Sequence, residues 1–152
     1  MYEKFGQFID GKWQASSNKE TYEVINPANE EVIGHASKAT PEDVNRALKS
    51  AEKGLEVWKK TSPWKRSSVI RKIADLIRAK QDVLAKWITL EVGKPFIESK
   101  GEVGATADIF EWNSEETKRI YGQTVESRFE ETRIHVYYQP IGVVAAMSPW
   151  NF

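Results

Sequence analysis

The sequence predicts an α/β protein that begins with short strands, continues through four helices and ends at the first strand of a parallel sheet. Apolar residues alternate in short runs near the beginning and recur every three or four residues through the middle of the chain. The run Val143–Met147 is apolar at every position, which is typical of a strand buried on both faces. Because a parallel sheet needs several strands, we expect the fold to be truncated.

The first forty residues are predicted to form short strands joined by tight turns. Residues 5–13 alternate weakly, and Asp10-Gly11 interrupts them with a pair that favours a hairpin turn. Residues 22–25 form a second strand, closed by a turn over residues 26–29 that contains Pro27. Val32 and Ile33 then form a third strand.

Two helices are predicted to begin with the same signal, a hydroxyl residue followed by proline. Thr40 precedes Pro41 and two acids that the helix dipole favours, and Ser62 precedes Pro63. Apolar residues follow each start at helical spacing. They are Val44, Leu48, Ala51, Leu55 and Trp58 in the first helix, and Val69, Ile70, Ile73, Leu76 and Ile77 in the second.

Two more helices are predicted between residues 82 and 121. The first covers residues 82–90 and stops at Gly93, as helices often do at glycine. The second runs from residue 97 to 121, about 35 Å at 1.5 Å per residue. Its apolar side carries Ala105, Ile109 and Trp112. We expect this side to be core, with the lining of a substrate tunnel as the alternative.

A hairpin is predicted after the last helix. Residues 124–128 and 133–139 read as its two strands, and Pro140 ends the second because proline cannot donate a ladder hydrogen bond. Tyr137 and Tyr138 and the strand edges need covering, since unpaired edges invite association. Association with another chain would cover them. The alternative is a local sheet that folds onto this chain's own helices.

The composition excludes several classes of function. Lys+Arg and Asp+Glu are both 22, so the net charge is zero, and we expect no nucleic-acid partner and no anionic membrane surface. No apolar stretch approaches the ~18 residues of a membrane-spanning helix, and the chain begins without an apolar signal-peptide core. We therefore expect a cytoplasmic protein. The chain has no cysteine and only two histidines, so no metal site is expected.

The segment 141–152 is unusual as a chain end. Domains normally end in exposed polar residues, whereas this sequence ends on Trp150, Asn151 and Phe152. We expect a truncated piece whose sheet is encoded further on.

Several segments resemble the aldehyde dehydrogenase superfamily, in that family's order and approximate spacing. The matching residues are Ile9–Trp13 with Val24–Asn29, Trp58 with Arg66 and Leu90–Pro95, Gln139–Val144, and Ser148–Phe152 with its Pro-Trp-Asn-Phe motif. Residues 110–122 are most similar to succinate and related semialdehyde dehydrogenases, although Asn113 stands where an aromatic residue is usual. The resemblance implies the amino-terminal part of an enzyme that oxidises an aldehyde, with a semialdehyde favoured, to its acid using NAD or NADP.

The resemblance also implies roles for the last residues. In this family a cysteine thiolate attacks the aldehyde, and Asn151 corresponds to the side-chain amide that stabilises the resulting oxyanion. Ser148, Pro149 and Trp150, with Asn151, correspond to residues beside the cofactor, and Phe152 corresponds to the aldehyde pocket. The nucleophilic cysteine, the glutamate base and the phosphate loop have no match here, so we expect the isolated chain to be inactive.

The resemblance divides the chain into three parts. Residues 1–121 are the helical part of the cofactor-binding domain, 122–140 the hairpin of the oligomerisation arm, and 141–152 the first strand and loop of the nucleotide-binding sheet. A homodimer or homotetramer of the full-length form is implied. Two alternatives stay open: a non-catalytic module that binds another chain through the hairpin, and a degenerate homologue that binds a nucleotide without turning it over.

Other polar residues are interpreted as structural. Glu91 and Lys94 flank a helix end, and His35 and His135 lie in strand or turn positions, so we expect no catalysis from them. The charges at Glu115, Glu116, Lys118 and Arg119 are predicted to form a solvated helix face.

Overall fold

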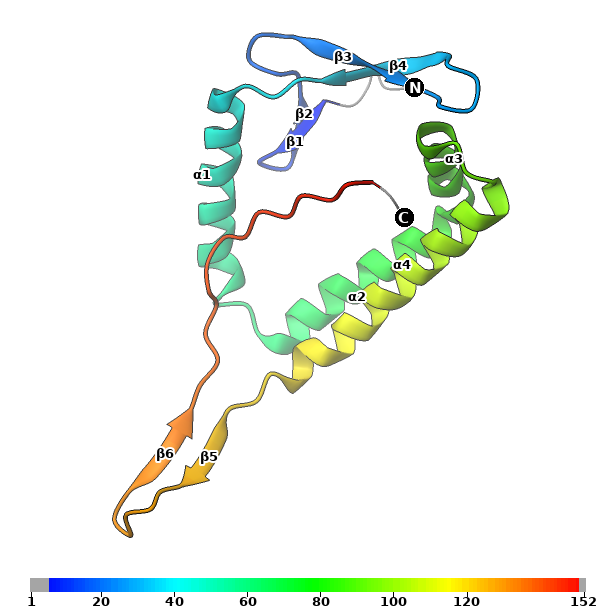
Figure 1. The fold of residues 1–152 in the computed structure, drawn as a ribbon. Helices are drawn as coiled ribbons and strands as arrows, with labels where there is room; N and C mark the ends of the chain where they lie inside the picture. Colours follow the sequence, from blue (N-terminus) through cyan, green and yellow to red (C-terminus); the bar gives the residue numbers. More distant parts are fainter. Residues whose placement is uncertain (1–5, 151–152) are drawn as a thin grey trace.

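A computed structural model describes residues 6–150 of the chain. Its elements follow the predicted order: strands, helices and a hairpin (Figure 1). They are β1 (Gln7–Ile9), β2 (Lys12–Gln14), β3 (Thr21–Ile25), β4 (Val32–Ser37), α1 (Pro41–Trp58), α2 (Pro63–Ala79), α3 (Gln81–Val92), α4 (Phe96–Glu116), the 3-10 turn η2 (Thr117–Arg119), β5 (Gln123–Glu126) and β6 (Arg133–Val136).

The first hairpin confirms the turn predicted at Asp10-Gly11. Both residues have positive φ, 54° and 74°, as a two-residue type I′ turn requires. The register pairs Phe8 with Trp13, and their rings lie 5.1 Å apart. Residue 5, the expected start of this strand, lies outside the described residues.

The second hairpin pairs β3 with β4 in antiparallel register, from Thr21 opposite Ser37 to Ile25 opposite Val32. β4 is longer than the two residues predicted. The register shifts between Val24 and Ile25, next to the turn that contains Pro27. This irregularity ends the ladder where the chain reverses.

The predicted starts of the first two helices are confirmed. Thr40 Oγ1 accepts a hydrogen bond from the Asp43 N–H, and the Thr40 N–H donates in return to the Asp43 carboxylate, which forms a capping box for α1. Ser62 accepts from the Lys65 N–H and caps α2. Each helix therefore begins where a hydroxyl satisfies an otherwise unpaired N–H.

The end of α3 is also where the sequence predicts it. Gly93 has φ +77° and its N–H donates to the Thr89 carbonyl, which closes the helix. A Cβ built on Gly93 would lie 2.9 Å from Pro27 Cγ. Glycine is therefore required both for the left-handed backbone and for the close approach of the β3–β4 turn.

α4 is shorter than predicted and buries a different face. It ends at Glu116, and the more tightly wound 3-10 turn η2 follows it before the hairpin. The predicted core side is exposed: Ile109 and Trp112 are 62% and 69% accessible. The buried residues are instead the small side chains Ser99, Val103, Ala107 and Ser114.

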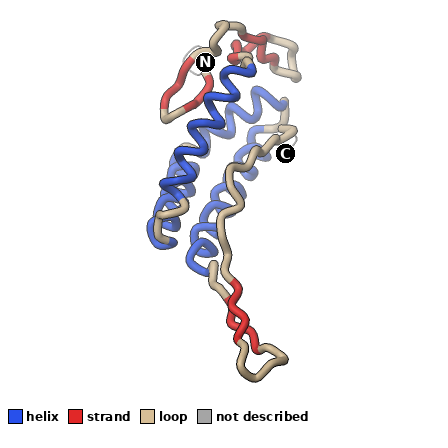
Figure 2. The backbone as a smooth tube through the Cα atoms, turned by 90° about the vertical axis from the view of Figure 1, so that its left-hand side faces the viewer, coloured by secondary structure: helices blue, strands red, loops and turns tan. Residues whose placement is uncertain are grey.

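The choice of the buried face of α4 has a steric reason. Helices α2 and α4 lie side by side over most of their length, and α3 packs against the first half of α4 (Figures 1 and 2). Ala74, Ala85 and Ala107 are fully buried between these helices. Small side chains allow the helix axes to approach closely, so size rather than hydrophobicity selects the packed face of α4.

The β5–β6 hairpin projects from the end of the helical body (Figures 1 and 2). Its strands pair from Gln123 opposite Val136 to Glu126 opposite Arg133, and every residue of both strands is exposed. The predicted hairpin is confirmed, with shorter strands. Tyr137 and Tyr138 follow β6 and are also exposed, so the described helices do not cover the hairpin.

The closing segment does not form the strand predicted at Val143–Met147. Residues 141–149 are extended but pair with no other strand of the described chain, and Ile141 and Met147 are 94% and 93% exposed. A strand is defined by its partner, because its N–H and C=O groups need a neighbouring backbone. No partner lies within residues 6–150.

Candidate functional site

The structure places part of the predicted site at the end of the closing segment. Ser148, Pro149 and Trp150 are all exposed. Trp150 has φ +59°, a left-handed conformation that tryptophan rarely adopts. The expected oxyanion donor Asn151 and the expected pocket residue Phe152 lie outside the described residues.

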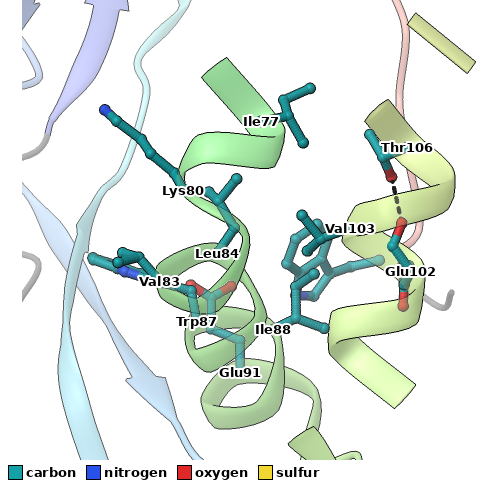
Figure 3. A pocket seen from close by; sticks show the side chains of 11 residues that line it. Ile77, Lys80, Val83, Leu84, Trp87, Ile88, Glu91, Glu102, Val103 and Thr106 are labelled. Carbon is teal, nitrogen blue, oxygen red and sulfur yellow. Dashed lines mark hydrogen bonds between the residues drawn. The ribbon is translucent and has the colours of Figure 1, made fainter. Parts of the chain in front are cut away.

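A groove lies between the end of α2, α3 and the first half of α4, and Trp150 forms part of its wall. Its volume is about 590 Å³, within the usual range for small-molecule sites. Figure 3 shows the side chains from the two sides facing this space. The lining consists of Ile77, Lys80, Val83, Leu84, Trp87, Ile88, Glu91, Glu102, Val103, Thr106 and Trp150.

Two polar residues that line this groove, Glu102 and Thr106, are engaged in contacts within the fold. Lys94 Nζ lies 2.6 Å from Glu102 Oε2, and this ion pair ties the end of α3 to α4. Thr106 Oγ1 donates to the Glu102 carbonyl at 2.9 Å (Figure 3). The pairing of Lys94 agrees with the structural role expected for it, and the groove presents an apolar surface.

A second cluster joins α2 to α4 through charges. Arg71 pairs with Glu111 and, at 2.9 Å, with Glu115, while Arg78 pairs with Glu111 and, at 2.7 Å, with Asp108. A hydrogen bond from Arg78 is the main cause that lowers the pKa of Glu111.

The charged face predicted around residues 115–119 is therefore only partly solvated. Glu115 bonds to Lys118 at 2.7 Å as well as to Arg71, and Lys118 lies 5.4 Å from the Trp64 ring centroid. Hydrogen bonds, first from Lys118, lower the pKa of Glu115. The helix periodicity places these charges on α4 and η2, but it does not indicate that Glu115 pairs with Arg71 of α2, 44 residues earlier in the chain.

Asp43 is a buried carboxylate whose hydrogen bonds stabilise the fold. It is 1% exposed and accepts hydrogen bonds from the Thr40 N–H, the Ser17 N–H, Gln7 Nε2 and the Arg46 guanidinium. The sequence indicated only an acid at the start of a helix. The spacing of Thr40 and Asp43 was the signal for the capping box, but Ser17 and Gln7 could not be identified without the fold.

The histidines and acids provide no metal centre in residues 6–150. His135 Nδ1 lies 3.1 Å from Thr124 Oγ1 across the hairpin, and His35 is opposite Glu23 in the β3–β4 ladder. Both lie in strands, where the sequence had predicted strand or turn positions. Among the same residues, no helix combines the length and the hydropathy that crossing a bilayer demands.

Comparison with known proteins identifies the relatives of this arrangement. Residues 13–152 match the model of the aldehyde dehydrogenase family. Glutarate-semialdehyde dehydrogenase of Pseudomonas aeruginosa is 42% identical over 95% of this chain, and succinate semialdehyde dehydrogenase of Acinetobacter baylyi is 43% identical over the same share. The chain spans 30% of the length of each of these relatives.

Solved structures agree with the sequence matches. An E. coli NADP dependent enzyme superposes with a TM-score of 0.92 and 38% identity over 99% of this chain and 32% of its own. Succinate-semialdehyde dehydrogenase from Burkholderia pseudomallei gives 0.91 and 39% over 95% of this chain and 30% of its own.

The strands, the helices and the projecting hairpin together define the amino-terminal portion of an α/β fold that the longer relatives share. The chain belongs to the aldehyde dehydrogenase family. The fold predicted from the sequence is confirmed at this level, including the correspondence to only the amino-terminal part of longer relatives.

Proposed function

We propose that this chain is the amino-terminal part of an NAD(P)-dependent aldehyde dehydrogenase that oxidises a semialdehyde to the carboxylic acid. The observation that carries the proposal is the family match from residue 13 through the closing Pro-Trp-Asn-Phe motif. The substrate class rests on the semialdehyde dehydrogenases at 42% and 43% identity. NAD and NADP remain equal alternatives, since one similar structure is described as NADP dependent and another was solved with NAD+.

The proposed chemistry assigns Asn151 one task. A cysteine thiolate from the remainder of the parent enzyme attacks the aldehyde carbon, and the carbonyl oxygen becomes an oxyanion. The Asn151 amide donates a hydrogen bond to that oxygen. An uncharged donor stabilises the developing charge without forming a permanent ion pair with a carboxylate. NAD or NADP, when bound, would supply the acceptor for the hydride that leaves the former aldehyde carbon, and hydrolysis of the resulting thioester by water would release the acid and the free thiol.

The residues before Asn151 fit a place beside the cofactor. Ser148 and Trp150 are exposed, so a hydroxyl and part of an indole face are available to a ribose and a nicotinamide ring. Pro149 restricts the backbone between them. Phe152 is assigned to the wall of the aldehyde pocket. These four assignments rest on the family motif.

The three divisions of the chain are part of the same proposal. Residues 1–121 support the cofactor-binding domain, residues 122–140 form an oligomerisation arm, and residues 141–152 begin the nucleotide-binding sheet. The exposed strands of β5–β6 and the adjacent Tyr137 and Tyr138 support the arm, because such edges are normally covered in the working protein. A homodimer or homotetramer is the proposed assembly.

The test uses a polypeptide that joins this chain to the remaining length found in its relatives. Asn151→Ala is expected to lower kcat by about 100- to 1,000-fold with a smaller effect on KM, as loss of one oxyanion donor typically does. Asn113→Ala, which removes an exposed amide from α4, is the matched control and should retain the parent kcat. An Asn151→Ala enzyme with the parent kcat would overturn the assignment.

The isolated chain provides a second test. It has no cysteine, so it lacks the nucleophile that the proposed reaction needs. We expect the purified 152-residue chain to give no aldehyde-dependent reduction of NAD or NADP. Turnover by this chain alone would require a different chemistry and would contradict the proposal.

A further inference from the structure

The charged run at the end of α4 has no part in the proposed chemistry, yet the structure gives it contacts with α2. Six residues form one continuous series in which the contacts alternate between α2 and the α4–η2 segment. In order they are Arg78, Glu111, Arg71, Glu115, Lys118 and Trp64. On α2 the series extends from residue 78 to residue 64, about 21 Å along the helix. We call these six residues the α2–η2 network.

Lys118 is the residue through which this network reaches η2. Its Nζ lies 2.7 Å from Glu115 Oε2 and 5.4 Å from the Trp64 ring centroid, inside the limit of about 6 Å for a cation–π contact. Glu115 in turn lies 2.9 Å from Arg71. A single exposed ion pair contributes little stability, but charges that share partners restrict one another's side chains. η2 is therefore attached to α2 directly, through Trp64, and indirectly, through Glu115 and Arg71.

The link from η2 to the hairpin is short. Arg119 ends η2 and Gln123 begins β5, so four Cα–Cα steps join them, at most about 14 Å. The Tyr121 N–H donates to the Arg119 carbonyl at 2.8 Å, which shortens the link further. A Cβ built on Gly122 would lie 2.6 Å from the Val136 carbonyl oxygen, so the two strands meet closely at the base of the hairpin. The position of η2 therefore sets where the hairpin begins.

We propose that the α2–η2 network fixes the direction in which the β5–β6 hairpin leaves the helical body (Figures 1 and 2). Lys118 is its positioning residue, because it is the member of the network that belongs to η2. In an oligomerisation arm, the network would hold the hairpin in the orientation that a second copy of the chain requires. Only this last step rests on the proposed function.

The direct test measures how the hairpin is held relative to α2. The chain has no cysteine, so introduced thiols are the only sites for nitroxide spin labels. Lys72→Cys on α2 and Val125→Cys in β5 replace exposed residues. Double electron–electron resonance gives the distribution of distances between the two labels, and dilution with unlabelled chain restricts the signal to pairs within one chain. The parent network should give one narrow distribution.

Two controls separate the hairpin from the rest of the molecule. The label pair Lys72→Cys with Ala105→Cys joins exposed positions of α2 and α4, so it reports the packing of the helical body alone. The matched variant is Arg119→Met, which removes a 2.8 Å ion pair with Glu116 that joins η2 to α4 and not to α2. Arg119→Met should leave both distance distributions unchanged.

The decisive variant is Lys118→Met, which keeps a long side chain and removes the charge. It should shift and broaden the distribution between the α2 and β5 labels and leave the α2–α4 distribution unchanged. Lys118→Arg should restore the parent distribution, because a guanidinium pairs with a carboxylate and stacks on an aromatic ring. An unchanged α2–β5 distribution in Lys118→Met would overturn the proposal. So would an equal broadening of the α2–α4 pair, or the same shift in Arg119→Met.

The step to assembly is measured separately, in the polypeptide that joins this chain to the remaining length of its relatives. Sedimentation velocity should show a smaller share of oligomer for Lys118→Met than for Arg119→Met at equal concentration. Equal shares, with a shifted hairpin in the labelled chain, would overturn the role of the network in assembly. The spin-label result needs neither catalysis nor assembly, so its failure is distinct from a failure of the Asn151→Ala test of function.

Discussion

At the start of α1, the side chains of Thr40 and Asp43 each accept a hydrogen bond from the other residue's backbone N–H. The Thr40 N–H donates to Asp43 Oδ2 at 2.9 Å, and the Asp43 N–H donates to Thr40 Oγ1 at 3.2 Å. The Asp43 carboxylate also accepts from the Ser17 N–H at 3.1 Å, so one side chain caps the helix and holds the preceding loop. This buried carboxylate joins the β-hairpin region to α1.

Thr40→Ala is expected to lower the free energy of unfolding by about 1 kcal/mol, because it removes the side-chain acceptor for the Asp43 N–H. Urea denaturation followed by circular dichroism measures the change. Thr40→Ser retains the hydroxyl and should remain close to the parent. Equal losses for the two variants would show that the methyl group, and not the cap, contributes the stability.

Acidification is expected to destabilise the chain through Asp43. Hydrogen bonds, first from the Thr40 N–H, hold the pKa of this carboxyl well below its ordinary value of 3.8. Because the folded pKa is the lower one, the stabilisation is complete above the ordinary value and is lost as pH falls from about 4 toward the folded pKa.

The measurement is the urea midpoint as a function of pH. Asp43→Asn should lower the midpoint at neutral pH and flatten its decline in acid, because the titrating group is gone. Glu42→Gln changes the exposed neighbouring acid and is the control. An Asp43→Asn profile that declines as steeply as the parent would assign the acid sensitivity to other carboxylates.

Gly93→Ala is expected to destabilise the chain by more than about 1 kcal/mol, since the left-handed backbone penalises a Cβ and the Cβ would meet Pro27. Gly101→Ala is a matched control inside α4, where a Cβ meets nothing within 4 Å. That control should stabilise the chain by up to about 1 kcal/mol through helix propensity. Thermal denaturation of both variants separates the two effects, and a tolerated Gly93→Ala would contradict the close approach.

Ala107→Leu and Ala105→Leu test which face of α4 is packed. Ala107 is fully buried, so a larger side chain should cost about 1–3 kcal/mol or more, whereas Ala105 is exposed and its replacement should be nearly neutral. Chemical denaturation compares the two. A larger loss of stability in Ala105→Leu than in Ala107→Leu would show that the packed face is the one predicted by hydrophobic periodicity.

Local signals in the sequence predicted most of the elements. Thr40 and Ser62 mark helix starts because their hydroxyls bond to N–H groups three residues later, and Gly93 marks a helix end because it adopts positive φ. Asp10-Gly11 predicts its hairpin for the same conformational reason. Each signal acts within a few residues, so it can be identified without the rest of the fold.

The site could be predicted only as far as its motif. Ser148–Phe152 indicated a family and a set of roles, but nothing in the sequence indicated that Trp150 would line a groove formed by residues up to 73 positions earlier, at Ile77. Likewise, periodicity placed Ile109 and Trp112 inside, and the packed face of α4 is the one with small residues.

The sequence by itself determined the order of elements, their caps and the family, because these depend on short-range backbone chemistry and on a linear motif. Only the tertiary structure decided which face of α4 is buried, which helix pairs with Glu111 and Glu115, and where the closing segment lies. Those outcomes depend on shape and charge complementarity between segments 19 to 73 residues apart, which no local pattern encodes.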